Sequence, residues 1–587
     1  MQPALLPERP SRAPSGPPAP PPRRLARRPR RFTRQSAART AAWGLATLVA
    51  TAASLASLAL LAERDLWVAR ERLLAGDPAA ALVAASSVHW PEARPRALAA
   101  TALARALGRG GAAPAPELSF FEPEALVTNA IARGALAEAE RVATLLCRAR
   151  HPLGPLYAAA LALERGDEAA ARGLLASSLV PPTVRALGAR LERALAARAA
   201  GASRLVLDRS GELVAVTDAY GALQPTAEAA PFLAEALSRL AGLQPDALRE
   251  DAPALRLTLD LDLSRVATEA LGKERGSIVI VEPTTGAVLA AVSDPLTARK
   301  EPLAAFEQQR EPASIAKLLT AAAAYGSGHD ADALIGRMTC SGVERYDGRP
   351  LWCPWPSGRL AGLDHALAVS CNIAFANLGL AVGRERLLQE YRRWGFDERP
   401  PALLGAAGHV ETTPQDARQL ADLAIGLELT SITPLHAALL AAAVANDGRM
   451  PEPSLVAGSS GPLGLRATSA PASPARVVTE ARIARRLAQA MKAVPLYGTA
   501  AGVAPAGLEL AMKTGTASAP GLGYHVNYVG FLPAARPPLA FCVRLTGCRT
   551  SPRVHAAAHA VTARLLEALS ARPAPPPGPA PAPALSR

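Results

Sequence analysis

The amino-acid sequence predicts an α+β fold for residues 256–570, with a central antiparallel sheet flanked by helices. One reason is a β-hairpin pattern at residues 276–295, where two apolar runs flank Pro-Thr-Thr-Gly. Another is a pair of apolar runs within residues 525–547, near the other end of this segment. The sequence between them has the three- and four-residue spacing of helices. Because strand patterns stand at both ends, we expect one sheet that joins distant segments.

Length and composition restrict the class of protein. A chain of 587 residues can form two or three domains, and a charged fraction of 19% excludes global disorder. The net charge of +14 is unevenly placed, because residues 1–40 hold ten arginines and only one acidic residue. The rest of the chain is nearly balanced. The basic character therefore belongs to a Pro-rich tail and predicts no nucleic-acid partner.

An uncharged run follows this tail and predicts a transmembrane helix over residues 41–62. A helix of 22 residues spans the hydrocarbon layer of about 30 Å. The arginines before it keep the tail in the cytoplasm by the positive-inside rule, so everything after residue 62 is exported. A cleaved signal peptide is the alternative, but the basic leader is long and no A-x-A site closes the run. A buried helix of a soluble protein is the third interpretation.

Residues 63–200 predict an all-α module. Leu, Ala and Val recur at helical spacing, with Gly or Pro at the breaks. Gly134 and Gly166 each precede an Ala-rich amphipathic stretch and lie 32 residues apart, which is close to the period of tetratricopeptide-type hairpins. Ala-rich sequences imitate such repeats easily, so a plain helical spacer or docking domain remains the alternative.

Two shorter segments complete the organisation. Residues 201–255 begin with alternating apolar residues around a Ser-Gly turn, which predicts a β-hairpin within a short linker or pedestal-like element. Residues 571–587 are rich in Pro and Ala and predict a disordered tail.

Lysine is rare in this chain, and its positions are therefore informative. The five lysines are Lys273, Lys300, Lys317, Lys492 and Lys513. Unlike Arg, a buried Lys can lose its proton and act as a base. Ser314 precedes Lys317 by three residues near a predicted helix start, which places both side chains on one face within hydrogen-bonding reach. Alone, Ser-x-x-Lys is a weak signal, since a solvated helix face is its usual explanation.

Two more motifs follow in order. Ser370-Cys371-Asn372 begins 56 residues after Ser314, and Lys513-Thr514-Gly515-Thr516 begins 143 residues after Ser370. The second motif suits an edge strand along which an extended peptide pairs, with Gly515 allowing a close approach. Lys513 would supply positive charge there, and Thr514 and Thr516 would supply hydroxyl donors for a carboxylate. Together the three motifs are a strong signal.

In this order the motifs resemble those of the penicillin-binding proteins and serine β-lactamases. The stretches around residues 258–271, 276–295, 432–448 and 528–541 narrow the resemblance to the transpeptidase domain of class B penicillin-binding proteins. The resemblance covers about residues 204–570. The usual pedestal domain is absent or reduced, and no glycosyltransferase signature stands in residues 63–200, which argues against a bifunctional class A enzyme.

The resemblance implies roles for the motif residues. Ser314 would be the nucleophile, Lys317 its general base and Ser370 a proton relay polarised by Lys513. Asn372 would hold the substrate amide. The last three motif residues would bind substrate, with the two threonine hydroxyls on its terminal carboxylate. The backbone N–H groups of Ser314 and Thr516 would form the oxyanion hole.

Cysteine and histidine predict little more. A disulfide between Cys340 and Cys353 is plausible in an oxidising compartment, while Cys371 packs as a small apolar residue. No spacing matches a zinc site, so we expect no metal and no cofactor. The nine histidines are scattered and each is most simply structural or solvated. His525 lies near the strand that would pair with the substrate strand.

The predicted function is a peptidoglycan D,D-transpeptidase anchored in the bacterial inner membrane, with a periplasmic catalytic domain. It would cross-link stem peptides ending in D-Ala-D-Ala through an acyl-serine, be acylated by β-lactams, and work with a membrane glycan polymerase. The first alternative is a carboxypeptidase, β-lactamase or β-lactam sensor of the same fold. The second is a catalytically weak scaffold. Neither the cellular role nor the acceptor amine follows from the sequence.

Overall fold

The computed structural model describes much of the chain after residue 54. The described residues are 55, 57–73, 77–88, 96, 100, 101, 123–132, 135–148, 150–176, 185–243, 253–354, 356–397, 407–465, 467–469, 475–519, 521, 523–533, 535 and 538–572. The tail 1–40, most of the predicted transmembrane run 41–62 and residues 573–587 lie outside them. None of the described helices combines the length and the apolar character needed to cross a bilayer.

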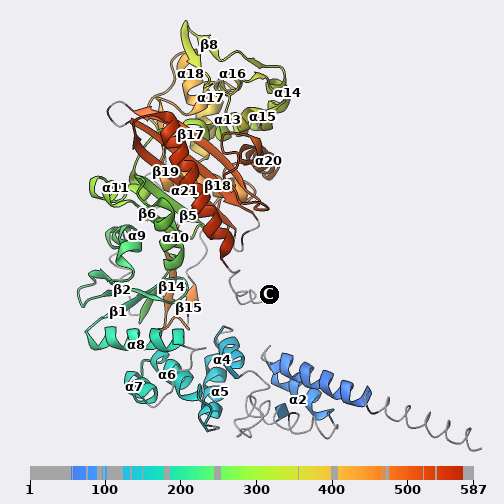
Figure 1. The fold of residues 1–587 in the computed structure, drawn as a ribbon, viewed down its shortest axis with the longest axis vertical. Coiled ribbons are helices and arrows are strands. Elements are labelled where there is room, and N and C mark those ends of the chain that lie inside the picture. The colour runs from blue at the N-terminus through green and yellow to red at the C-terminus, as the bar shows by residue number, and fades with distance from the viewer. Residues whose placement is uncertain are drawn as a thin grey trace, which may run out of the picture.

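A five-stranded antiparallel sheet forms the centre of the C-terminal half (Figure 1). Its strand order is β17 (Ala511–Ala519), β18 (Gly523–Leu532), β19 (Leu539–Cys548), β5 (Gly276–Val281) and β6 (Val288–Ser293). The β19–β5 pairing, with Ala540 opposite Val281, joins the two ends of the segment. This confirms the predicted α+β architecture. β17 is an edge strand.

Helices cover both faces of this sheet because its strands alternate two kinds of side chain. Tyr528 faces α21 (Ser551–Ala571), where its ring lies 6.4 Å from that of His555. Asn527 faces the opposite side and accepts a bond from the buried Arg544, which also donates to the carbonyl of Ile432 beside α19 (Pro434–Ala445). α10 (Leu261–Leu271) packs beside α21.

A mainly helical lobe lies beyond β17. Its helices are η3 (Ala313–Ala316), α13 (Lys317–Gly326), α14 (Ala331–Gly336), α15 (Leu363–Ala368), α16 (Asn372–Val382), α17 (Arg384–Arg393), α18 (Ala417–Ile425) and α20 (Ala481–Tyr497). Its short strands are β7 (Thr339–Cys340), β8 (Val343–Tyr346), β9 (Arg349–Trp352) and β10 (Gly358–Arg359). Both α20 and η3 contact β17, so the lobe and the sheet meet at the edge strand.

Smaller elements connect these parts. They are α9 (Ala230–Leu243), α11 (Pro295–Lys300), α12 (Ala304–Glu307), β11 (His409–Val410), β12 (Thr430–Ser431), β13 (Arg449–Met450) and β16 (Arg476–Val477).

A second sheet lies between the catalytic half and the N-terminal helices. Its order is β15 (Ala467–Ser469), β14 (Val456–Ser460), β4 (Ala254–Leu257), β1 (Arg204–Leu207), β2 (Leu213–Thr217) and β3 (Leu223–Pro225). The predicted hairpin around the Ser-Gly turn is the β1–β2 pair. The sheet thus combines strands from the predicted pedestal-like element with a hairpin inserted from the predicted catalytic domain.

The N-terminal helices form a separate core that extends onto this second sheet. They are a helix over residues 57–73, α2 (Pro78–Ser86), α4 (Pro123–Ala132), α5 (Leu136–Arg148), α6 (Gly154–Glu164), α7 (Glu168–Ala176) and α8 (Arg185–Ala199). Leu205 and Leu207 pack with these helices, whereas Val206 packs with the catalytic half. The period-2 alternation of β1 therefore serves two cores.

Two contacts hold the helices in place. A Cβ on Gly154 would lie 2.5 Å from the backbone nitrogen of Cys147, so α5 and α6 approach as closely as glycine allows. The buried carboxylate of Glu164 accepts the backbone N–H of Leu463 at 2.7 Å, in the loop between β14 and β15. Consecutive helices α4 to α7 contact one another. The tetratricopeptide-type repeat stays a prediction.

Candidate active site

Ser314 lies in a short 3-10 helix immediately before α13. Ala313, directly before it, adopts a positive φ of 50° and donates its N–H to the carbonyl of Gly426 at 2.8 Å. A left-handed backbone costs a residue with a side chain about 1–2 kcal/mol. A Cβ on Gly426 would lie 2.4 Å from the carbonyl oxygen of Ala313, so glycine permits this contact. The surrounding backbone thus holds Ser314, which is partly exposed, in a strained turn.

Lys317 begins α13 one turn later and is fully buried. Its Nζ donates to the carbonyl oxygen of Ser370 at 2.7 Å, to Oδ1 of Asn372 at 2.7 Å and to Oγ of Ser370 at 3.3 Å. Residues three apart eclipse one another along a 3-10 helix, so Ser314 and Lys317 share a face as predicted. The hydroxyl of Ser314, however, makes no hydrogen bond to any described residue, because the lysine is directed at the second motif.

Ser370 occupies the turn between α15 and α16 with a positive φ of 54°. The N–H of Cys371 bonds to the carbonyl of Ala366 at 2.9 Å and closes this turn. The Oγ of Ser370 also accepts a bond from Nζ of Lys513 at 2.9 Å. The structure therefore brings Lys317, Ser370, Asn372 and Lys513 together, with one hydroxyl between two amines.

Both amines are shifted toward the neutral form. Burial lowers the pKa of Lys317 to about 8. Burial and the positive charge of Lys317 lower the pKa of Lys513 well below its ordinary value. Two adjacent buried ammonium groups are costly, so the pair holds one proton more readily than two. Since Lys317 has two acceptors at 2.7 Å, the empty site favours the proton there, whereas the motif resemblance implies the positive charge on Lys513.

The edge strand β17 carries the third motif against the nucleophile segment. A Cβ on Gly515 would lie 2.6 Å from the carbonyl oxygen of Pro312 and 3.2 Å from the backbone nitrogen of Ser314. Only glycine lets the strand come this close. The backbone N–H groups of Ser314 and Thr516, the predicted oxyanion hole, therefore belong to two segments in direct contact. Thr514 is buried and Thr516 is partly exposed.

Two residues that hold these threonine hydroxyls escaped the sequence prediction. Thr499 Oγ1 lies 2.5 Å from Thr514 Oγ1, and His555 Nε2 lies 2.6 Å from Thr516 Oγ1. Neither pair follows from a short-range spacing. His555 was expected to be structural or solvated, and this contact corrects that expectation. His525, opposite Ala517 in β18, bonds through Nε2 to the carbonyl of Glu311 at 3.0 Å and supports the backbone near the site.

The amide of Asn372 is fixed at both ends. Its Oδ1 accepts from Lys317, and its Nδ2 donates to the carbonyl of Trp352 at 2.8 Å. One N–H of the amide remains for a substrate carbonyl.

Three cysteines lie directly behind the second motif. The sulfur atoms of Cys340, Cys353 and Cys371 are all within 4.8 Å of one another, and all three cysteines are free thiols. The predicted Cys340–Cys353 disulfide is thus not formed in the structure. Cys353 Sγ is 3.7 Å from Cys371 Sγ and accepts the N–H of Asn372 at 3.1 Å, so Cys371 is a partner rather than simple packing. Within the described residues, only these side chains are arranged to hold a metal ion.

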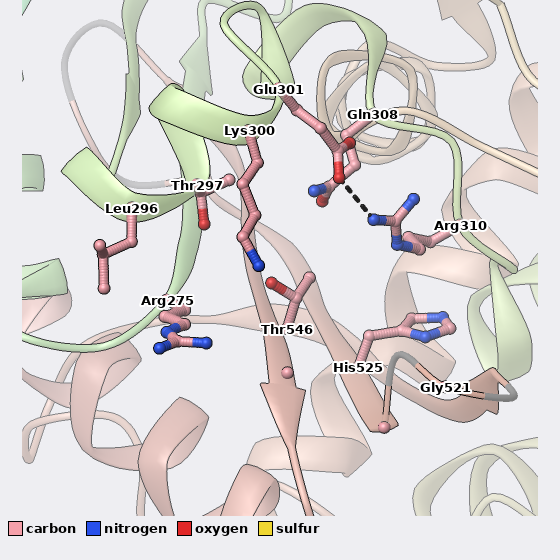
Figure 2. A pocket seen from close by; sticks show the side chains of 12 residues that line it. Arg275, Leu296, Thr297, Lys300, Glu301, Gln308, Arg310, Gly521, His525 and Thr546 are labelled. Atoms are coloured by element: carbon pink, nitrogen blue, oxygen red, sulfur yellow. Dashed lines mark hydrogen bonds and ion pairs between the residues drawn. The ribbon is translucent and has the colours of Figure 1, made fainter.

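A separate cavity of about 250 Å³ lies at the end of the central sheet (Figure 2). Figure 2 shows Lys300 extending into it, with Arg275 and Arg310 also on its wall. Its one acidic side chain, Glu301, accepts a bond from Arg310 at 2.7 Å. None of the predicted motif residues lines this cavity, so it is distinct from the candidate active site. Its excess of cations attracts anions.

Comparison with known proteins gives a consistent result. Residues 276–567 match the family described as the penicillin binding protein transpeptidase domain. The peptidoglycan D,D-transpeptidase PbpA of Mycolicibacterium smegmatis is 32% identical over 309 residues, covering 46% of this chain and 62% of the relative. PbpA of Mycobacterium tuberculosis is 29% identical over 313 residues, with the same coverage. The chain thus spans about three fifths of the length of these relatives.

Solved structures show the same fold. The D,D-transpeptidase domain of a peptidoglycan glycosyltransferase from Eggerthella lenta matches with a TM-score of 0.54 and 22% identity, covering 63% of this chain and 99% of that one. Penicillin-binding protein A of M. tuberculosis, as a ceftriaxone acyl-enzyme complex, matches with a TM-score of 0.53 and 22% identity, covering 63% and 98%.

Proposed function

Because this chain belongs to the class B penicillin-binding proteins through its transpeptidase domain, we propose that it is a peptidoglycan D,D-transpeptidase. Its substrates are stem peptides ending in D-Ala-D-Ala, and β-lactams acylate it as substrate mimics. The observation that carries the proposal is the Ser370 hydroxyl, which lies 2.9 Å from Nζ of Lys513 and 3.3 Å from Nζ of Lys317. An acyl-transfer enzyme needs such a route for a proton between nucleophile and leaving group.

Acylation begins when Ser314 Oγ attacks the carbonyl carbon of the penultimate D-Ala. The Oγ–C bond forms as the hydroxyl proton passes to the neutral amine of Lys317. The N–H groups of Ser314 and Thr516 stabilise the oxyanion. When the C–N bond breaks, the Ser370 hydroxyl protonates the departing nitrogen and is reprotonated from the lysine pair. The terminal D-Ala leaves, and Ser314 carries an ester.

Transfer runs through the same groups in reverse. The amine of a second stem peptide attacks the ester carbonyl, and its extra proton moves through Ser370 to the lysine pair. The ester bond to Ser314 breaks, its oxygen regains a proton, and a new amide joins the two peptides. Splitting the exchange in this way replaces one difficult step by two easier ones.

The substrate carboxylate also activates the base in this proposal. In the empty site the proton of the lysine pair favours Lys317, which is then unable to accept another. A carboxylate beside Lys513 stabilises an ammonium there and draws the proton across Ser370. Lys317 becomes the neutral base at the moment the substrate is bound.

We extend the proposal to the setting of the reaction. The uncharged run 41–62 anchors the chain in the inner membrane, the tail 1–40 is cytoplasmic and the catalytic half is periplasmic. A membrane glycan polymerase is the proposed partner, reached through the anchor or the helical module. These assignments rest on the charge pattern of the sequence.

The test is covalent labelling with a fluorescent penicillin. The wild-type chain should be labelled, and Ser314→Ala should abolish labelling because the nucleophile is gone. Ser327→Ala, at the other end of α13, is the matched control and should label normally. Persistent labelling of Ser314→Ala would show that another residue is the nucleophile.

A second measurement separates the transpeptidase from the alternatives. Wild-type acyl-enzyme should be long-lived in water and should be consumed by an added amine acceptor with a stem-peptide donor. Rapid turnover of a chromogenic cephalosporin would indicate a β-lactamase, and release of D-Ala without cross-linking would indicate a carboxypeptidase.

A further inference from the structure

His555 is held against the substrate strand by two neighbouring elements. It lies in the first turn of α21, between the ring of Tyr528 on β18 and the hydroxyl of Thr516 on β17. Its Nε2 is 2.6 Å from Thr516 Oγ1, which is a short hydrogen bond between two groups that can each donate or accept. The direction of this bond decides what the threonine hydroxyl can do next.

The neutral imidazole has two tautomers with opposite effects. If Nε2 carries the proton, it donates to Thr516 Oγ1, and the hydroxyl proton of Thr516 is free for another acceptor. If Nε2 is unprotonated, Thr516 must donate to it and has no proton left. Burial and the nearby charge of Lys513 lower the pKa of His555, so the neutral forms dominate at neutral pH.

The neighbouring threonine shows the same arrangement. Thr514 Oγ1 lies 2.5 Å from Thr499 Oγ1, so both hydroxyls of the third motif are held by a side chain from another element. A hydroxyl held through its lone pair presents its proton in one direction. A pair of such hydroxyls matches the two oxygens of a carboxylate.

We propose that His555 is a positioning residue for substrate recognition: its Nε2–H holds Thr516 so that the threonine hydroxyl donates to the terminal carboxylate of the substrate. This inference rests on the proposed function. His555 touches neither the substrate nor the reacting atoms, and acts through Thr516 alone. It therefore governs capture of carboxylate-bearing substrates and leaves the acyl-transfer step to the lysines and Ser370.

The experiment compares acylation by benzylpenicillin with acylation by its methyl ester, which lacks the free carboxylate. In His555→Phe, the second-order rate constant for benzylpenicillin should fall about tenfold, the size expected for loss of one charge-assisted hydrogen bond. The constant for the ester should stay within about twofold, because that compound has no carboxylate to lose. The loss should appear in the apparent dissociation constant rather than in the limiting acylation rate.

Three further variants test the assigned role. His555→Gln keeps an N–H donor and should restore most of the rate. Thr516→Val should abolish the effect of His555→Phe when the two are combined, since the histidine acts only through that hydroxyl. His559→Phe is the matched control, one turn along α21, where His559 contacts only the backbone carbonyl of Ala501 at 3.2 Å, and it should behave as wild type.

The outcomes separate this inference from the proposed function. If the wild type reacts with neither compound, the proposed function fails. If the wild type reacts and His555→Phe slows both compounds equally, or Gln fails to rescue, or the effects of the two substitutions add, His555 is only structural and the inference is wrong. Thermal unfolding of each variant should show that the folded state persists.

Discussion

Two pairs of lysines in this chain occupy opposite environments. Lys317 and Lys513 are fully buried and contact one serine hydroxyl from two sides. Lys300 extends into the open cavity at the end of the sheet (Figure 2), and Lys492 forms a surface ion pair with Glu509 at 2.5 Å. Only the buried pair has lost the high proton affinity of an ordinary lysine. Burial, rather than residue type, therefore creates the chemistry.

The largest effect should come from removing the buried base. Lys317→Met should reduce acylation by fluorescent penicillin by about 1,000-fold, within the range that general-base catalysis contributes. Lys317→Arg should be no better, because a guanidinium stays charged. Lys300→Met is the matched control and should label at the wild-type rate. Equal rates for the Lys317 and Lys300 variants would remove the distinction between the two environments.

The pH dependence of stability should show a smaller effect of the same burial. The unfolded chain holds the Lys317 proton up to about pH 10.5, whereas the folded chain loses it near a pKa of about 8. Between these values the unfolded state binds more protons, so the free energy of unfolding rises with pH. Relative to Lys317→Met, the wild type should gain about 3 kcal/mol across this window. Urea denaturation of both proteins at pH 7, 8, 9 and 10 measures it, and a constant difference would contradict the burial argument.

The smallest effect should come from the exposed ion pair. Lys492→Met should change the free energy of unfolding by less than about 1 kcal/mol, because solvent screens the charge pair. Thermal unfolding at low and high salt provides the measurement. A larger loss would show that this surface lysine also depends on its environment.

The sequence predicted the site better than its surroundings. Lys317, Ser370, Asn372 and Lys513 stand in short motifs whose order indicates convergence, and they do converge. His555 and Thr499 lie 39 and 15 residues from their threonine partners, in contacts set by how α21 and the end of α20 dock. No periodicity records such docking. The Cys353–Cys371 approach likewise depends on how β9 folds over α16.

The second sheet was also only partly predictable. The alternation in β1 and β2 indicated a hairpin, but its neighbours β4 and β14 are about 50 and 250 residues away along the chain. Glu164 and Leu463 likewise pair across 299 positions. Such distant pairings follow from tertiary packing, which local patterns do not encode.

The hairpin β14–β15 has a consequence for how this chain matures. Synthesis delivers the N-terminal helices and strands β1 to β4 long before residues 456–469 leave the ribosome. Until then β4 has a bare edge and Glu164 has no amides to receive its charge. The helical module should therefore complete its docking late, after most of the catalytic half has been made, which gives the chain a built-in order of assembly.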